Sequence, residues 1–244
     1  LSGSKLHVTR AGKGKPVLVL HHETGTLDRL PFYDALAAKY DVLVPHHPGF
    51  SRSQRPDWMR SVRDIAVAYR GLLASLKIKE VSLVGLGFGG WIAAEMASMG
   101  PADVSKLVLV GAMGIKPPHG DKGGDILDLA ITGYVDYARA GFHDQKAFDA
   151  VYGAEPSGDQ LEMWDICREM SFRIAWKPYM YSQTLPHLLG AVKAPALIVW
   201  GDDDKVVPLS AGRRYLEALP DARLETIRAC GHCVDMEQPE ALAR

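Results

Sequence analysis

Apolar and polar residues alternate in a regular way along the first half of the chain. Continuous apolar runs, typical of strands buried on both faces of a sheet, lie at Val17–Leu20, Asp41–Pro45, Val81–Val84 and Lys106–Val110. Apolar residues at helical spacing lie between these runs, over Arg29–Lys39, Ser61–Leu76 and Trp91–Met99. A shorter strand is predicted at Lys5–Arg10. This alternation predicts a parallel sheet wrapped by helices.

The alternation stops in the middle of the chain and resumes near its end. Residues 115–189 look helical throughout and are rich in aromatic residues. The later elements are a strand at Ala196–Trp200, a helix at Leu209–Leu219, a strand at Arg223–Arg228 and the start of a helix at Gln238–Arg244. We therefore interpret residues 115–189 as an insertion that folds over one edge of a single α/β sheet.

The composition is that of an ordinary globular protein, and it narrows the possible partners. Of the 244 residues, 47% are hydrophobic and 23% are charged, and 28 Lys and Arg against 29 Asp and Glu leave a net charge of −1. This balance gives no general attraction to nucleic acid or anionic lipid, and no apolar run approaches the roughly 18 residues of a membrane helix. We expect a small-molecule substrate, no nucleic-acid or membrane partner, and a monomer or homodimer.

The cysteine content and the chain ends add two expectations. Three cysteines are too few for a disulfide framework, which favours a reducing, cytoplasmic compartment. The chain begins at Leu1 rather than at a methionine, and Arg244 falls early in the last predicted helix, so we expect further residues at both ends.

A glycine-rich segment after the third buried run has two possible meanings. Gly85-Leu86-Gly87-Phe88-Gly89-Gly90 fits the G-x-G-x-x-G fingerprint of dinucleotide sites and lies between a strand and a helix. That fingerprint also needs an acidic residue at the end of the next strand, where this chain has Val110-Gly111-Ala112-Met113. The same strand–turn–helix setting fits the G-x-S-x-G nucleophile elbow of hydrolases, with Gly85 and Gly89 as the flanking glycines.

The segment Cys230-Gly231-His232-Cys233 also has two interpretations. It matches the C-x-x-C string of disulfide isomerases, but that chemistry needs the first cysteine at a helix N-terminus, and the helix signal begins only near Glu237. Alternatively, His232 follows the final strand, where the histidine of a hydrolase triad lies. The triad acid would then come from Gly201-Asp202-Asp203-Asp204, with Asp204 favoured over its rivals Asp202 and Asp203, of which spacing excludes Asp203 less well.

Together these segments resemble the α/β-hydrolase family over nearly the whole chain. The matching segments are Leu20-His21 with Gly25, Pro48-Gly49-Phe50-Ser51-Arg52-Ser53, the glycine-rich elbow, Trp200-Gly201 through Asp204 with Val207-Pro208, and Gly231-His232 with Glu237-x-Pro239-Glu240. The resemblance implies an α/β-hydrolase core at residues 1–114 and 190–244, with a helical cap at residues 115–189. It also implies no cofactor, and an oxyanion hole and pocket formed by Phe88, His22, Glu23 and Leu86.

The nucleophile position of the resemblance holds Gly87, which has no side chain to attack a carbonyl. Glycine tolerates the backbone conformation of such an elbow without strain. We expect the missing serine side chain to leave room for about one water, held by His232 and the Phe88 N–H. His232, oriented by Asp204, is then the expected general base on that water or on the substrate.

Histidines and an acid stand where the family is usually glycine or aspartate. By the resemblance, His21-His22-Glu23 and His46-His47 end neighbouring strands on the rim that holds Gly87. His21, His46 and His47 form a possible additional polar site. A carboxylate at Glu23 would oppose a developing oxyanion, which suggests chemistry without an oxyanion or a cation between Glu23 and the histidines. Because no fixed metal-ligand spacing is present, we expect ordinary hydrogen bonding and no metal; a metal would use His22, Glu23 and His232.

Three functional hypotheses remain open. The first is a hydrolase that acts without a covalent nucleophile on a small, partly apolar substrate. The second is a catalytically inactive hydrolase-fold protein that binds a small ligand. The third is an engineered Ser-to-Gly form of a serine hydrolase, such as an esterase or C–C hydrolase. The further changes at His22, Glu23 and His46 argue against the third, because a trap variant needs only one substitution.

Overall fold

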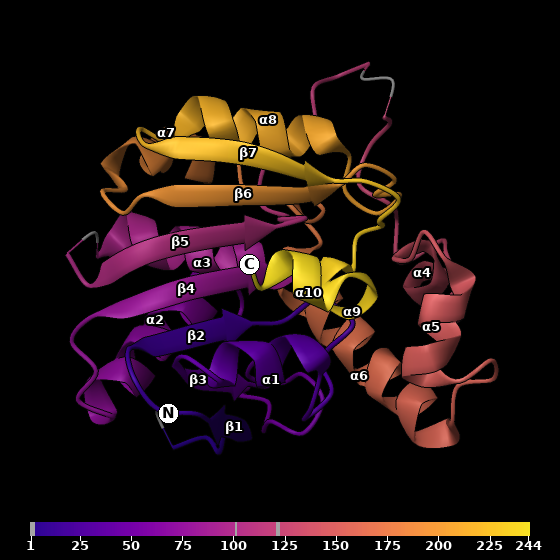
Figure 1. Cartoon of the computed structure of the whole chain (residues 1–244), viewed down its shortest axis with the longest axis horizontal. Helices are drawn as coiled ribbons and strands as arrows, with labels where there is room; N and C mark the ends of the chain where they lie inside the picture. The colour runs from indigo at the N-terminus through magenta and orange to yellow at the C-terminus, as the bar shows by residue number, and fades with distance from the viewer. Residues whose placement is uncertain (1–2, 101, 121–122) are drawn as a thin grey trace.

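A seven-stranded sheet lies at the centre of the computed structural model, which describes residues 3–100, 102–120 and 123–244 (Figure 1). The strands are β1 (Val8–Ala11), β2 (Pro16–Leu20), β3 (Asp41–Pro45), β4 (Val81–Leu86), β5 (Val104–Val110), β6 (Ala196–Gly201) and β7 (Ala222–Ile227). Their order is β1-β3-β2-β4-β5-β6-β7, with β1 antiparallel to β3 and the other neighbours parallel. This arrangement confirms the predicted α/β class.

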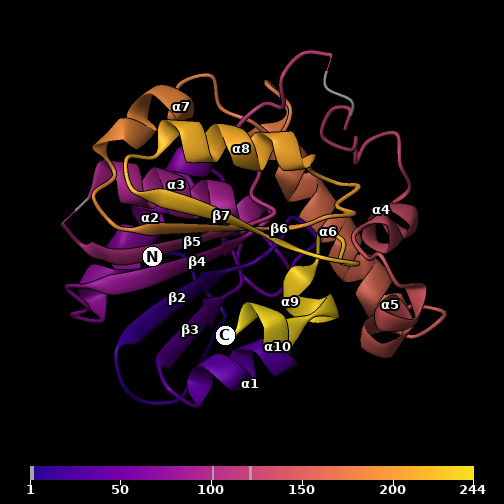
Figure 2. The same ribbon diagram turned by 45° about the horizontal axis from the view of Figure 1, so that its top comes forward.

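Helices cover both faces of the sheet (Figure 2). One face carries α2 (Val62–Ser75), α3 (Phe88–Met99), α7 (Leu185–Leu188) and α8 (Leu209–Ala218). The other face carries α1 (Pro31–Ala37), α9 (Val234–Glu237) and α10 (Pro239–Leu242). Each face has its own apolar core, because the continuous apolar strands present buried side chains in both directions. Among the described residues, no helix combines the length and apolar character needed to cross a membrane.

The glycine-rich run allows α3 to pack closely against the strands. A Cβ on Gly89 would lie 2.1 Å from the carbonyl oxygen of Leu20, and a Cβ on Gly90 would lie 2.4 Å from the Cβ of Ala112. Any larger residue at either position would push α3 away from β2 or β5. The N-terminus of α3 is therefore held at the carboxyl end of the central strands.

The insertion between β5 and β6 divides into two parts. Helices α4 (Tyr134–Ala140), α5 (Gln145–Tyr152) and α6 (Gly158–Ala175) lie together beyond the carboxyl ends of the strands (Figure 1). The later part, α7 with the 3-10 helix η1 (Leu189–Ala191), packs against α3 instead. We use the term cap for α4, α5 and α6.

Some helix boundaries differ from the sequence prediction. Helix α3 begins at Phe88 rather than Trp91, and α9 begins at Val234 rather than near Glu237. The insertion is not helical throughout, since the described parts of residues 115–133 and residues 176–184 contain no helix. These two stretches hold Pro117, Pro118 and Pro178, whose missing N–H groups disfavour a helix interior.

Candidate active site

The candidate site centres on Gly87, in the turn between β4 and α3. Gly87 has φ 51° and ψ −113°, a conformation that L side chains rarely adopt. Its N–H donates to the carbonyl of Val110 at 2.9 Å, and its own carbonyl accepts from the N–H of Met113 at 3.0 Å. These bonds fix the turn against the end of β5 and so fix the direction of the first N–H of α3, on Phe88.

His232 faces this turn from the loop after β7, and Asp204 holds its ring. Nδ1 of His232 lies 2.9 Å from Oδ2 of Asp204, and both side chains are 1% exposed. Oδ1 of Asp204 accepts from the N–H groups of Val206 at 2.9 Å and Val207 at 2.8 Å. Because Nδ1 is paired with Asp204, Nε2 is the ring nitrogen available to Gly87.

The rival acid, Asp203, is paired elsewhere. Its Oδ2 lies 2.8 Å from Nδ1 of His143 and 3.0 Å from Nζ of Lys205, and all three groups are partly exposed. The structure therefore brings Asp204, and not Asp203, to His232.

Glu237 secures the loop that carries His232. Its Oε2 accepts from the N–H of Gly231 at 2.6 Å and from the N–H of His143 at 3.2 Å, while its Oε1 accepts from the N–H of Asp144 at 2.6 Å. His143 and Asp144 directly precede α5. One carboxylate thus joins the His232 loop to the cap.

Glu23 also points into the site, from the segment after β2. Its Oε1 accepts from the hydroxyl of Tyr137 on α4 at 3.0 Å and lies 3.7 Å from Nε2 of His232. Its Oε2 accepts from the N–H of Phe88 at 3.4 Å, a long hydrogen bond. The N–H expected to bind an oxyanion therefore faces a carboxylate. Leu86, the last residue of β4, lies beneath the site with its side chain fully buried.

His22 completes the site and is held by a second carboxylate. Its Nε2 lies 2.8 Å from Oδ1 of Asp235 on α9, and the two side chains are 1% and 0% exposed. Nδ1 of His22 and Nε2 of His232 are buried and have no hydrogen-bond partner. The rings of His22 and His232 lie with their centroids 5.0 Å apart. We name His22, Glu23 and His232 the elbow cluster.

The elbow cluster fills the space above Gly87. A Cβ on Gly87 would lie 2.6 Å from Nδ1 of His22, 2.8 Å from Oε2 of Glu23 and 2.8 Å from Nε2 of His232. The expectation that a missing serine leaves room for a water above Gly87 is therefore wrong, because these three side chains occupy that room. A cavity of about 10 Å³ lies instead beside Glu23, Tyr137 and His232, which is close to the space of one water.

The charges of the elbow cluster depend on one another. Burial alone would lower the pKa of His232, but Asp204 and Glu23 outweigh burial and raise that pKa to about 10. Burial alone would raise the pKa of Glu23, whereas His232 and His22 lower it to about 2. The site thus favours a carboxylate at Glu23 beside a positive charge at Nε2 of His232.

The other histidines singled out in the sequence lie outside the elbow cluster. His21 and His47 stack on each other with ring centroids 3.6 Å apart, and we name them the stacked pair. His46 lies with its Nε2 3.3 Å from Oδ1 of Asp28, which is also 3.0 Å from Nε2 of His7. We name His7, Asp28 and His46 the rim cluster.

The two competing motif interpretations fit the structure poorly. A dinucleotide would place its phosphates at the N-terminus of α3, where the Glu23 carboxylate lies against the N–H of Phe88. Cys230 and Cys233 are buried free thiols, and burial raises the pKa of both. Reactive cysteines of redox motifs have lowered pKa values, so these thiols are better explained as packing groups.

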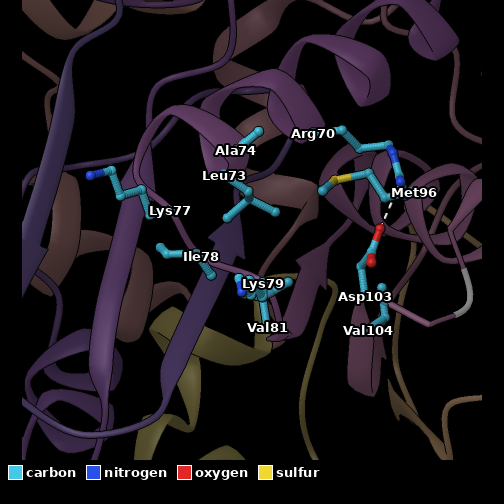
Figure 3. Close-up of a pocket in the computed structure, with 10 residues that line it drawn as sticks. All are labelled: Arg70, Leu73, Ala74, Lys77, Ile78, Lys79, Val81, Met96, Asp103 and Val104. Carbon is cyan, nitrogen blue, oxygen red and sulfur yellow. Dashed lines mark hydrogen bonds and ion pairs between the residues drawn. The ribbon is translucent and has the colours of Figure 1, made fainter.

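A larger hollow is distant from the elbow cluster. It has a volume of about 550 Å³ and lies beside the amino ends of β4 and β5, where Lys77, Lys79 and Val81 line it (Figure 3). The ion pair between Arg70 and Asp103, at 2.7 Å, lies on its wall. Since Val81 and Leu86 are at opposite ends of β4, about 17 Å separates this hollow from the site.

Two residues of the site were missed by sequence reasoning. Tyr137 was grouped only with the aromatic residues of the insertion, and Asp235 lies in a four-residue helix that the hydrophobic pattern does not reveal. The one available signal for Asp235 is its position three residues after His232. For Tyr137 the sequence holds no signal, because its contact with Glu23 depends on how α4 is placed over the sheet.

The chain is similar to known proteins along nearly its whole length. A model of the "Alpha/beta hydrolase family" matches residues 17–244. A 2-hydroxy-6-oxononadienedioate/2-hydroxy-6-oxononatrienedioate hydrolase from Paraburkholderia phymatum is 30% identical, with 97% of this chain and 87% of that protein covered. A 2-hydroxy-6-oxo-6-phenylhexa-2,4-dienoate hydrolase from Comamonas testosteroni is 27% identical, with 100% and 90% covered. The solved structure of a meta-cleavage product hydrolase from Pseudomonas fluorescens IP01 aligns with a TM-score of 0.81 at 22% identity, covering 100% of this chain and 93% of that one.

Proposed function

Because this chain belongs to the alpha/beta hydrolase family, we propose that it hydrolyses a bond next to a carbonyl group in a small, partly apolar substrate without a covalent serine intermediate. The observation that carries this proposal is the Asp204–His232 pair, whose free Nε2 faces the turn at Gly87. A water molecule, rather than a side chain, is then the nucleophile.

The proton transfers follow from the position of His232. The base is the neutral His232 ring: release of Glu23 removes one of the two carboxylates that raise the pKa of His232. Nε2 then accepts one proton from the attacking water, and the remaining hydroxide adds to the carbonyl carbon. The bond to the leaving carbon or oxygen then breaks, and His232 returns its proton to that atom. Asp204 stabilises the imidazolium in between and holds the ring in place.

The relatives favour a carbon–carbon bond as the one that is cleaved. Their names describe hydrolases of 2-hydroxy-6-oxo dienoates, which carry a keto group on an unsaturated acid. We extend only the bond type and the keto group to this chain. The carbonyl oxygen would use the Phe88 N–H, so Glu23 has to release that N–H before the substrate binds.

Substrate entry requires the cap to move. Glu23 and His232 are each 1% exposed, and the cavity of about 10 Å³ beside them is far smaller than the roughly 300 Å³ of a small ligand pocket. Tyr137 joins the cap to Glu23. We therefore propose that α4 opens together with the release of Glu23. The three buried, free cysteines fit a cytoplasmic location, which we also propose.

Turnover of an aryl ester, a lactone and a 2-hydroxy-6-oxo dienoate by the wild type and by His232→Gln tests the proposal. The wild type should release product from at least one of these compounds, and His232→Gln should not. The matched control is His7→Gln in the rim cluster, which should keep the wild-type rate. A fluorophosphonate probe, which labels activated serines, should leave the protein unmodified. Labelling at a serine would contradict the non-covalent route.

A second function is favoured by the carboxylate in the expected oxyanion hole. Glu23 against the Phe88 N–H hinders ester chemistry, which supports a hydrolase-fold protein that binds a small ligand without turnover. Saturable binding of the same compounds, measured by calorimetry with no product formed, would establish this alternative. An engineered Gly87 is less well supported, because the His22 and Glu23 side chains already occupy the space of a serine.

A further inference from the structure

We propose that the elbow cluster binds one divalent transition-metal ion directly above Gly87, with Nδ1 of His22, a carboxylate oxygen of Glu23 and Nε2 of His232 as its protein ligands. The donor atoms of these three residues all lie within 4.8 Å of one another, and all three side chains are buried. The site is distant from the hollow beside the amino ends of β4 and β5.

The two imidazole nitrogens are free and directed at the same point. Nδ1 of His22 and Nε2 of His232 have no hydrogen-bond partner, although both side chains are only 1% exposed. A buried polar atom without a partner destabilises the fold, and two in one place call for an explanation. A metal ion would satisfy both atoms with their lone pairs.

Each ligand also has the supporting contact that metal sites usually provide. Metal-binding histidines commonly donate their other ring N–H to a carboxylate. Here Asp235 lies 2.8 Å from Nε2 of His22, and Asp204 lies 2.9 Å from Nδ1 of His232. Tyr137 donates to Glu23 at 3.0 Å. These contacts hold the outer ring nitrogens, so that once metal binding has displaced the proton on Nε2 of His232, the lone pairs of both inner nitrogens face the ion.

The three ligand residues converge on the position that a side chain of residue 87 would take. The position of a Cβ on Gly87 is 2.6 Å, 2.8 Å and 2.8 Å from atoms of the three ligand residues. Ligands at about 2.1 Å from a tetrahedral zinc ion lie about 3.4 Å apart, and Oε1 of Glu23 is 3.7 Å from Nε2 of His232. An ion slightly outside the Cβ position therefore needs only small movements of the three side chains. A side chain at position 87 would displace it.

Charge also favours a cation here. Glu23, Asp204 and Asp235 are buried carboxylates, with side chains 1%, 1% and 0% exposed. In the described part of the chain, no Lys or Arg forms an ion pair with any of them. Buried charges are normally paired or coordinate a metal. A divalent ion would leave this group of three carboxylates with one net negative charge.

The rim cluster differs from the elbow cluster because its carboxylate already pairs with an arginine. Its donor atoms also lie within 4.8 Å of one another, but Asp28 already pairs with the guanidinium of Arg52 at 2.5 Å. A metal ion there would compete with a resident positive charge. Among the described residues, the carboxylates of the elbow cluster form ion pairs only with histidines, whose protons a metal ion can displace, so the two clusters provide a matched comparison within one chain.

The donor set selects the class of metal. Two imidazoles and one carboxylate are the ligands of catalytic zinc sites and of non-haem ferrous iron sites. Magnesium and calcium prefer sets made of oxygen. We therefore infer zinc or ferrous iron, and the experiment distinguishes them. When the ion is bound, the lone pair of His232 belongs to the metal, and the metal replaces His232 as the group that activates water.

Metal content and metal affinity test this inference without relying on activity. The protein is purified without affinity histidines from medium supplemented with zinc and iron, and its metals are counted by inductively coupled plasma mass spectrometry. The stripped protein is then titrated with Zn²⁺, and anaerobically with Fe²⁺, by calorimetry. Co²⁺ serves as a spectroscopic probe, since its visible bands report the coordination number. We expect one ion per chain.

Matched variants locate the ion. Glu23→Gln and His22→Gln should weaken zinc affinity at least about 100-fold, and Asp235→Asn about 10–100-fold, since it removes only a supporting contact. His7→Gln, in the rim cluster, should leave the affinity unchanged. Circular dichroism of each stripped variant checks that it is folded. If Glu23→Gln does not fold, the Co²⁺ spectrum of Asp235→Asn still reports the site.

The outcomes separate this inference from the proposed function. One ion per chain that is lost in the elbow variants supports the metal site, whether or not a substrate is turned over. A metal-free wild type, or equal affinity in His7→Gln and Glu23→Gln, overturns it. Turnover by a wild type that also binds no added Zn²⁺ or Fe²⁺ overturns the metal site and leaves the proposed hydrolase intact.

Discussion

Histidines that are neighbours in the sequence have opposite environments in this fold. In the stacked pair, all four ring nitrogens have partners: His21 contacts the carbonyl of His22 and the N–H of His47, and His47 contacts Tyr69 and the carbonyl of His21. In the elbow cluster, His22 and His232 each have a carboxylate at one nitrogen and no hydrogen-bond partner at the other, although Oε1 of Glu23 lies 3.7 Å from Nε2 of His232.

The two environments change the pKa of an imidazole in opposite directions. Burial lowers the pKa of His47 to about 3 and that of His21 well below its usual value, so both stay neutral as structural groups. Against the same burial, the Asp204 and Glu23 carboxylates raise the pKa of His232 to about 10. All three histidines are buried, so the groups that contact each ring, and not burial itself, decide whether its pKa is lowered or raised.

The largest expected effect is on turnover. His232→Gln should lower kcat by about 100- to 10,000-fold, the usual contribution of a general base. His47→Gln, in the stacked pair, should keep kcat within about threefold. Steady-state kinetics with whichever compound the wild type hydrolyses measures both. An equal loss of kcat in both variants would show that the elbow cluster and the stacked pair do not differ in their effect on turnover.

The next effect is on stability and concerns Gly87. Gly87→Ala should destabilise the fold by about 2–4 kcal/mol, because the new Cβ meets three held side chains and the residue keeps a positive φ. Gly158→Ala at the start of α6 is the control, since nothing lies within 4 Å of its Cβ position. Urea unfolding provides both values, and a neutral Gly87→Ala would show that the elbow cluster is loosely held.

A smaller effect concerns acid stability, through the stacked pair. Burial lowers the pKa of His47 to about 3 in the folded chain. Between pH 6.5 and about pH 3, His47 is therefore protonated in the unfolded chain and neutral in the folded chain. The contribution of His47 to the free energy of unfolding is therefore fully present above pH 6.5 and is lost as the pH falls. His47→Gln removes this contribution. Between pH 4 and 6, the slope of the unfolding free energy against pH should therefore fall by about 1.4 kcal/mol per pH unit, as measured by urea unfolding.

Other titratable groups lie around His47 and also contribute to the slope of stability against pH. His21, His46 and Tyr69 face its ring, and His21 also titrates with a lowered pKa. The wild-type slope should therefore exceed the contribution of one histidine. His187→Gln on α7, whose side chain is outside these clusters, should leave the slope unchanged. An unchanged slope in His47→Gln would mean that its ring is protonated in the fold.

The smallest effect concerns the cap. Tyr137→Phe removes the hydroxyl that donates to Glu23 and should destabilise the protein by about 1–2 kcal/mol. It should also speed hydrogen exchange in α4, because one contact between the cap and the site is lost. Tyr134→Phe on the same helix is the matched control and should change neither quantity. If α4 exchanges at the wild-type rate in Tyr137→Phe, Tyr137 does not hold the cap closed.

The fold was predictable because its signals are local. Continuous apolar strands and the glycine-rich turn predicted the α/β class, which the sheet confirms, and the family resemblance is confirmed by the match over residues 17–244. The pairing of Asp204 with His232 followed from their order along the chain. The boundary of α9 was missed because a four-residue helix is too short for a periodic pattern.

The interior of the site was less predictable because it depends on side-chain direction. Sequence reasoning placed Glu23 toward the turn, but it expected space above Gly87 where the structure has two imidazoles and a carboxylate. It grouped His21, His46 and His47 as a possible additional polar site, whereas the structure stacks His21 on His47 and places His46 beside Asp28. Asp235 and Tyr137 come from elements whose positions only the tertiary fold sets.

Glu237 gives the cap and the His232 loop a common anchor. Its carboxylate accepts from the N–H of Gly231, next to His232, and from the N–H groups of His143 and Asp144 at the start of α5. Any swing of α5 away from the sheet must either break these bonds or pull His232 with it. We therefore expect that any opening of α5 for a ligand also shifts His232, because Glu237 is hydrogen-bonded to both segments.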